Sequence, residues 1–277
     1  MAIYGNMIQN KVDISVLESS FDNEFNNFNR IMESINILNE SGIILESVSL
    51  EKMIQTFKDL YRKFKEFIIK ILRELKSKLS KNKTNTSTTI DRGEEIIKYT
   101  KFEIHSDFFN FNNEFISHYS EFLQLPLSGD HLNINLDDEQ EVSKILNNSI
   151  EFEKRNPEIW KRFVDTANEV IQIEKTEEED KRTNVVRYYK DIRLKMEKSE
   201  NDVFNSITKI SNNALNSYRN FLSDLEKSSS GSTAICTLLR IALTDMNRLK
   251  SVITIGNKYI NKCHELIVTM NPILITN

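Results

Sequence analysis

The residues that could form a metal site are few, and their spacing does not match a known ligand set. The four histidines are His105, His118, His131 and His264. Glu114, His118 and Glu121 could share one face of a helix, because residues three or four apart are neighbours there. The carboxylate metal sites of helix bundles require Glu-x-x-His in two copies, and the chain has neither that spacing nor a second copy. We therefore predict no metal site.

Motifs of nucleotide-binding and hydrolytic enzymes are also missing from the sequence. Neither G-x-x-x-x-G-K-[ST] nor G-x-G-x-x-G occurs, and His264-Glu265 does not continue into H-E-x-x-H. The Ser-Gly-Ser sequence at 230–232 lacks the flanking glycines of the G-x-S-x-G nucleophile elbow. Cys236 and Cys263 are too far apart for C-x-x-C chemistry, so we interpret both as buried apolar residues. We predict that the protein is not an enzyme and that it binds no cofactor.

Composition favours an all-α protein. The chain has 277 residues with only six Gly and three Pro, which argues against a turn-rich β protein. Two Cys cannot form a disulfide scaffold. No stretch of about 18 uncharged apolar residues occurs, so we predict no transmembrane helix. Residues 1–10 lack a basic start followed by an apolar run, so we predict no signal peptide.

The strongest helical pattern runs from residue 50 to residue 79. Its apolar residues recur every three or four positions and fall within an arc of about 140°, which is typical of an amphipathic helix. A candidate apolar docking face consists of Phe57, Leu60, Phe64, Phe67, Ile71 and Leu75. Outside that arc lie the candidate contacts for an acidic partner or for lipid: Lys58, Arg62, Lys63, Lys65, Lys70, Arg73 and Lys76. Ile69 is the apolar residue that breaks the pattern on the polar side.

Positive charge is concentrated in this part of the chain. Residues 52–83 contain eleven Lys and Arg and three acids, a net +8, so the remainder of a chain of net charge −4 carries −12. Such a helix is typical of interfacial membrane helices and of helices bound by a partner. It is also compatible with a surface helix docked on an all-α domain, which we favour. Nucleic-acid contact comes last, because acids interrupt the basic side.

The flanking segments suggest two regions. Residues 13–39 show apolar spacing typical of a helix. Residues 81–90 are polar and have little to bury, so we interpret them as a linker. This linker divides the chain into an N-terminal helical region, 1–80, and a helical body, 91–277.

The first half of the body has a mixed pattern. Tyr99, Phe102 and Ile104 alternate over a short stretch that is compatible with a strand. Aromatic residues at helical spacing then predict a helix from residue 108 to residue 122. Between residues 136 and 174 we expect two helices broken at Asn156-Pro157, followed by a charged joint at 177–182.

The last third of the chain predicts a long antiparallel αα-hairpin. Two apolar stripes, at about 183–227 and 233–270, are joined by a short polar turn that contains Gly231. Ser199 and Gly256 occupy inward positions of these stripes, an irregularity that suits a hairpin packed on other helices. The predicted fold class is therefore all-α, with a basic amphipathic helix near the N-terminus and a long hairpin at the end.

The N-terminal block carries a family resemblance. Its segments are ESSFDNEF at 18–25, ESG at 40–42 and FKDLYRKFKEFIIK at 57–70. In composition and rhythm these resemble the opening of virion structural proteins from phages that infect low-GC Gram-positive bacteria. The resemblance covers about the first eighty residues. It implies a non-enzymatic component of the particle, internal or ejected, whose basic helix meets the host membrane or packaged DNA.

We therefore expect a structural or assembly protein of a phage virion, with other virion proteins or further copies of itself as partners. One alternative is a peripheral membrane-active protein that uses residues 50–79 at an anionic membrane surface. Another is an all-α binder or regulator of a host protein, in the bacterial cytoplasm or at the inner membrane surface. Nucleic acid is the less favoured partner.

Overall fold

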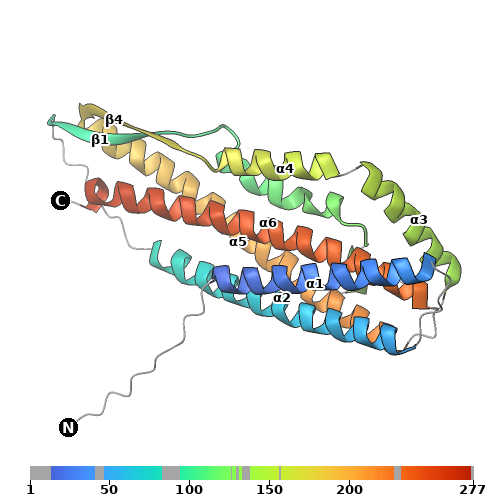
Figure 1. Ribbon diagram of the computed structural model, residues 1–277. Coiled ribbons are helices and arrows are strands. Elements are labelled where there is room, and N and C mark those ends of the chain that lie inside the picture. Colours follow the sequence, from blue (N-terminus) through green and yellow to red (C-terminus); the bar gives the residue numbers. More distant parts are fainter. Residues whose placement is uncertain are drawn as a thin grey trace, which may run out of the picture.

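Long helices packed side by side dominate the fold. A computed structural model describes residues 14–40, 47–82, 94–125, 127–128, 131–132, 138–155, 157–227 and 232–275. The long helices form an elongated bundle (Figure 1): α1 (Ile14–Glu40), α2 (Ser47–Asn82), α5 (Arg182–Leu225) and α6 (Ser232–Ile275). The predicted all-α fold class is confirmed.

Helices α5 and α6 form the predicted antiparallel hairpin. Each has 44 residues, a length of about 66 Å. Their bounds lie within a few residues of the predicted ones, and the two helices run in opposite directions along the bundle (Figure 1). The predicted polar turn lies almost entirely outside the described residues.

Aromatic side chains attach α1 and α2 to this hairpin. The ring of Phe57 on α2 lies 6.3 Å from that of Phe28 on α1 and 6.3 Å from that of Phe221 on α5. Two turns further along α2, the ring of Phe64 packs against that of Tyr218 of α5, with ring centroids 6.4 Å apart. One core therefore joins residues from both sides of the predicted boundary. Of the predicted linker, residues 81–82 belong to α2 and the rest lies outside the described residues.

Two shorter helices lie along the hairpin on the side away from α2 (Figure 1). α3 (Glu139–Arg155) and α4 (Pro157–Val170) confirm the predicted pair broken at Asn156-Pro157. Pro157 opens α4, where its missing N–H has no intrahelical partner to lose. Within α4, Ala167 and Val170 are buried in the core.

The helix predicted from residue 108 to residue 122 is present, but it is irregular and not an α-helix. The chain forms successive 3₁₀ and π turns there, at Phe108–Asn110, Asn112–Ile116 and Ser117–Phe122. The aromatic spacing does bring the side chains to the core: Phe111 stacks on Tyr259 of α6, with ring centroids 4.4 Å apart. Packing against the hairpin, rather than local propensity, sets the winding of this segment.

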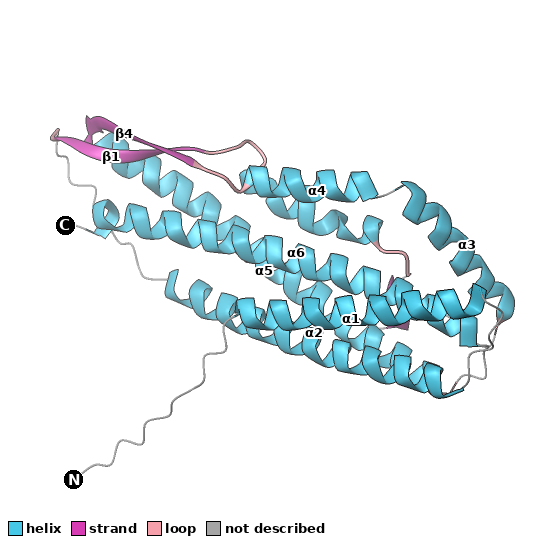
Figure 2. Ribbon diagram, in the orientation of Figure 1, coloured by secondary structure: helices cyan, strands magenta, loops and turns pink. Residues whose placement is uncertain are grey.

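A two-stranded antiparallel ribbon lies at one end of the bundle (Figure 2). It pairs β1 (Ile96–Glu103) with β4 (Glu174–Lys181), so the strand expected around Tyr99 is confirmed. The interpretation of residues 177–182 as a charged joint is wrong, because 177–181 pair with β1. Acids are depleted in strands, so only the pairing partner reveals this one. A shorter pair joins β2 (Leu127–Ser128) to β3 (His131–Leu132).

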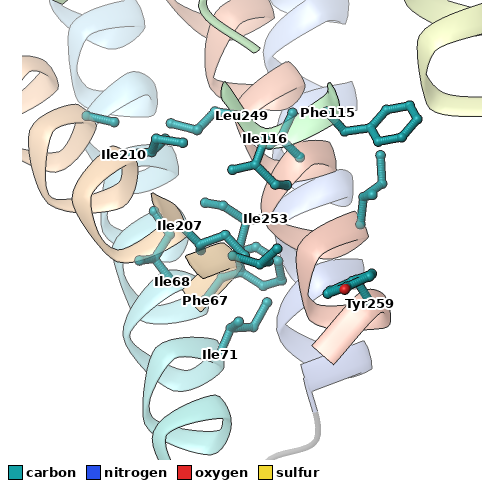
Figure 3. Close-up of a cluster of buried hydrophobic side chains, with 14 of the residues drawn as sticks. Phe67, Ile68, Ile71, Phe115, Ile116, Ile207, Ile210, Leu249, Ile253 and Tyr259 are labelled. Atoms are coloured by element: carbon teal, nitrogen blue, oxygen red, sulfur yellow. The ribbon is translucent and has the colours of Figure 1, made fainter. Parts of the chain in front are cut away.

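The two irregular inward positions of the hairpin each have a structural role. A Cβ at Gly256 would lie 2.1 Å from Cδ1 of Ile207, so glycine permits this close approach of α6 to α5. Figure 3 shows Ile207 in the buried cluster around this point. The buried Ser199 shares a 2.6 Å hydrogen bond with the hydroxyl of Tyr259, which donates to the carbonyl oxygen of Phe108 at 2.9 Å.

The buried carboxylate of Asp245 holds the end of the irregular segment on α6. It accepts hydrogen bonds from the backbone N–H of Gln124, at 3.0 and 2.9 Å, and of Leu125, at 2.8 Å. One turn away, Arg248 donates to the carbonyl oxygen of Phe122 at 2.6 Å. Burial raises the pKa of Asp245 to about 7, although these N–H groups and Arg248 act to lower it.

We expect Gly256→Ala to lower the free energy of unfolding by about 1–3 kcal/mol, because its Cβ overlaps Ile207. The higher helix propensity of alanine offsets about 1 kcal/mol of this overpacking cost, and we expect a net loss of stability. Ile207→Val removes Cδ1 and alone costs about 0.5–1.5 kcal/mol. The double variant should lose less than the sum of the single losses in urea denaturation. Strict additivity would contradict the close approach.

Asp245→Asn should alter the pH dependence of stability. The folded-state pKa of Asp245, about 7, lies above the value of about 3.9 in an unfolded chain. The folded state therefore binds a proton more tightly, and the contribution of Asp245 to stability falls as pH rises through 7. We expect the wild type to exceed the Asn variant in unfolding free energy by more at pH 5 than at pH 8. Urea denaturation at both pH values measures this, and a difference that grows with pH would contradict it.

Candidate interaction surface

Burial of its apolar side determines how α2 is oriented. The whole candidate docking face is fully buried: Phe57, Leu60, Phe64, Phe67, Ile71 and Leu75. These residues belong to the core shared with α1, α5 and α6. The hydroxyl of Tyr61 adds a 3.0 Å hydrogen bond to the carbonyl oxygen of Leu215 on α5. The chain itself therefore covers this face, and the opposite side of α2 is turned to solvent.

Three of the seven candidate basic residues are partly buried: Lys58, Lys63 and Lys70. Lys58 lies on the outer side of α2, whereas Lys63 and Lys70 lie on its flanks. Lys63 forms a 2.7 Å ion pair with Glu24 of α1, so it contributes to the packing of these two helices. Neither Lys63 nor Lys70 points directly outwards, and we exclude both from the outer surface described next.

The other five basic residues form a line with Ile69 along the outer side of α2. Spacings of four, three, four, four and three residues keep them within an arc of about 80°. The line is about 27 Å long, and Asp59 and Glu66 lie beside it, outside this arc. We call it the basic stripe: Lys58, Arg62, Lys65, Ile69, Arg73 and Lys76.

Within the described residues, intramolecular ion pairs involve the N-terminal end of the basic stripe. Lys58 pairs with Glu226, just beyond α5, and Arg62 pairs with Asp59 at 3.2 Å. Among the residues that the structure describes, no acid pairs with the last three cations: Lys65, Arg73 and Lys76. Ile69 lies among them and is 41% exposed. This part of the stripe presents three cations around one apolar side chain.

Such a surface offers positive charge to an anionic partner. An exposed ion pair contributes only about 0–1 kcal/mol, so several must form together for measurable affinity. Their attraction is screened by salt, with a Debye length of about 8 Å at physiological ionic strength. The length of the stripe suits acids spaced along a protein surface, or an anionic lipid surface.

The residues weighed as metal ligands do not converge. His118 Nδ1 lies 2.6 Å from Glu121 Oε1, and both side chains are exposed. Glu114 instead accepts a hydrogen bond from the side chain of Asn110 at 2.7 Å. Within the described ranges, no three His, Cys, Asp or Glu side chains are grouped to hold a metal ion.

Both cysteines lie buried in α6. Burial raises the pKa of Cys236 to about 11. Burial also raises the pKa of Cys263, and the nearby Glu200 raises it further. Because the thiolate is the reactive form, neither environment activates its cysteine as a nucleophile.

One surface hollow and the lengths of the helices complete the description of the surface. An open hollow beside α1 is lined mainly by small polar residues, together with the paired Glu24 and Lys63. None of the helices, over the residues that were described, is both long and apolar enough to cross a membrane.

The sequence pattern grouped seven cations, whereas the structure separates the flanking Lys63 and Lys70 from the outer line. It also gives Ile69 a place within the basic stripe. Angular position around the helix already carries part of this signal, because Ile69 and Arg73 lie on one side of α2. The pairing of Lys58 with Glu226 and of Lys63 with Glu24 depends on distant segments and has no local signal.

Comparisons with protein-family models, with curated proteins and with solved structures find no match to this chain.

We expect the basic stripe to be dispensable for folding. Lys65→Gln and Lys76→Gln should each change the free energy of unfolding by no more than about 0.5 kcal/mol, because both side chains are exposed and unpaired. Phe64→Ala, on the buried side of the same helix, should cost about 3–5 kcal/mol. Urea denaturation of the three variants measures the contrast. A large loss in either Gln variant would assign the stripe a structural role.

Proposed function

We propose that this protein is a non-enzymatic structural or assembly component of a phage particle and that it binds an acidic partner protein along the basic stripe of α2. The observation that carries the binding function is the line of cations along α2, held outwards because the other side of α2 is buried. The assignment to a particle rests on the resemblance of the N-terminal residues to virion proteins.

The rigidity of α2 supports a protein partner. Its position is determined by rings from α1 and α5 on either side of Phe57 and Phe64. A surface that is already ordered loses little conformational entropy on binding. Three unpaired cations around the exposed Ile69 would then provide charge attraction together with one apolar contact. The partner is another virion protein or a further copy of this chain.

An anionic membrane surface is the second candidate partner. The exposure of Ile69 within the basic stripe favours it. The apolar side chains that an interfacial helix would insert into lipid are, however, buried in the bundle. Binding of the folded chain to lipid would therefore depend on charge, at about 1 kcal/mol for each cation near the surface. A regulator that binds an acidic host protein would use the same stripe.

The test compares incorporation of variants into phage particles. The stripe variant carries Lys65→Glu, Arg73→Glu and Lys76→Glu. A matched control makes the same change of charge on exposed residues of α5: Arg187→Glu, Lys198→Glu and Lys209→Glu. Quantitative mass spectrometry of purified particles should detect the wild type and the control, with at least a tenfold loss of the stripe variant. Absence of the wild type from particles would refute the proposal.

Vesicle binding separates the membrane candidate from the protein candidate. If lipid is the partner, the wild type should co-sediment with vesicles that contain phosphatidylserine, and less so as salt is raised. The stripe variant should then lose this binding, whereas the α5 control keeps it. No binding of the wild type at low salt would eliminate the membrane candidate.

A further inference from the structure

The ribbon of β1 and β4 has two outer edges, and the chain closes one of them. Its register pairs Tyr99 with Glu178 and Lys101 with Thr176. In an antiparallel pair, the backbone groups of alternate residues point to the partner strand, and those of the residues between point away. Each strand of a two-stranded ribbon therefore presents one row of backbone groups to its outer edge.

Two tyrosines of α5 close the outer edge of β1 at Thr100 and Phe102. The hydroxyl of Tyr189 donates to the carbonyl oxygen of Thr100 at 2.9 Å and accepts from its N–H at 3.0 Å. The hydroxyl of Tyr188 makes the same pair of hydrogen bonds with Phe102, at 3.3 and 3.0 Å. These contacts show that the backbone N–H and carbonyl groups of Thr100 and Phe102 point to the outer edge. The backbone groups of Tyr99 and Lys101 therefore point to β4 and form the hydrogen bonds of the ladder.

The outer edge of β4 is open. Since Glu178 and Thr176 face β1, the outward row consists of Lys175, Glu177 and Glu179. Over the described parts of the chain, no hydrogen bond reaches the backbone N–H or carbonyl groups of these three residues. All three are exposed. An unpaired row of this kind can accept an additional strand.

The charge of β4 selects the strand that can pair with it. Its eight residues include five acids and two lysines. Two ion pairs with β1 neutralise part of this charge. Lys101 Nζ lies 2.9 Å from Glu178 Oε1, and Lys98 Nζ lies 3.8 Å from Glu179 Oε1. An excess of acids remains. Like charges directly opposite one another destabilise a sheet, so β4 of a second copy is a poor partner, whereas a strand with Lys or Arg matches the edge.

We infer that the outer edge of β4 binds an extended basic segment of a partner polypeptide, which becomes the third strand of the ribbon. Backbone hydrogen bonds to Lys175, Glu177 and Glu179 provide affinity, as in other cases of strand addition. Lysine or arginine side chains beside Glu177 and Glu179 provide selectivity. This surface is distinct from the basic stripe, and the inference does not depend on the proposed function.

The test uses a fluorescent, end-blocked peptide that alternates lysine with valine or threonine over seven residues. Glu177→Pro removes the outward N–H at the centre of the edge and leaves the ladder to β1 intact, because proline is tolerated where the N–H points to solvent. Glu177→Gln is the matched control, since it removes the same charge and keeps the N–H. By fluorescence anisotropy we expect the Pro variant to bind at least about tenfold more weakly than the Gln variant, the effect of losing one to two net hydrogen bonds.

Equal binding by the two variants would overturn the inference, because charge alone would then explain the affinity. No binding of the peptide to the wild type at low salt would overturn it as well. Circular dichroism with thermal unfolding checks that the Pro variant is folded. Should it not fold, a peptide N-methylated at every second residue is titrated against the wild type: loss of binding supports strand addition, and undiminished binding refutes it.

Discussion

Phe57 and Phe64 each contact one aromatic ring from α1 and one from α5, and this packing holds α2 in the bundle. Full burial of one such side chain is worth about 1.5–3 kcal/mol, and the apolar face of α2 provides a continuous row of them. Because this packing determines the rotation of α2 about its axis, it also determines which cations point outwards. The fold and the binding surface thus use opposite sides of one helix.

The hairpin contributes more than a second apolar surface. Three residues at inward positions of the hairpin are not large and apolar, and each of them serves a specific contact. Gly256 permits the close approach of α6 to Ile207. Asp245 accepts hydrogen bonds from the segment between residues 108 and 125, whose 3₁₀ and π turns do not satisfy every backbone group. Ser199 bonds to the hydroxyl of Tyr259, which itself donates to the carbonyl oxygen of Phe108. Polar residues at inward positions therefore position an irregular segment without interrupting either long helix.

In the ribbon at the end of the bundle, too, side chains of a long helix provide hydrogen bonds for backbone groups that would otherwise lack a partner. Tyr188 and Tyr189 close the edge of β1 with their hydroxyls while their rings pack with Tyr99. On β4 no such closure occurs within the described residues, and acids line the open edge. The molecule therefore presents two surfaces of opposite charge, a basic helix side and an acidic strand edge. The small net charge of −4 is the sum over the whole chain and does not describe either surface.

Apolar periodicity determined the long helices and the buried side of α2, and Pro157 determined the break between α3 and α4, because each depends on residues within a turn or two of one another. The candidate basic residues could likewise be identified from the sequence, and their angular positions carry part of their division into flanking and outer groups. Their ion pairs could not be predicted: Lys63 pairs with Glu24 of α1, and Lys58 pairs with Glu226 beyond α5. Strand β4 and the irregular winding after Phe108 were not predicted for the same reason. Their conformation depends on hydrogen bonds and ring contacts with segments distant in the chain, and only the assembled core brings those segments together.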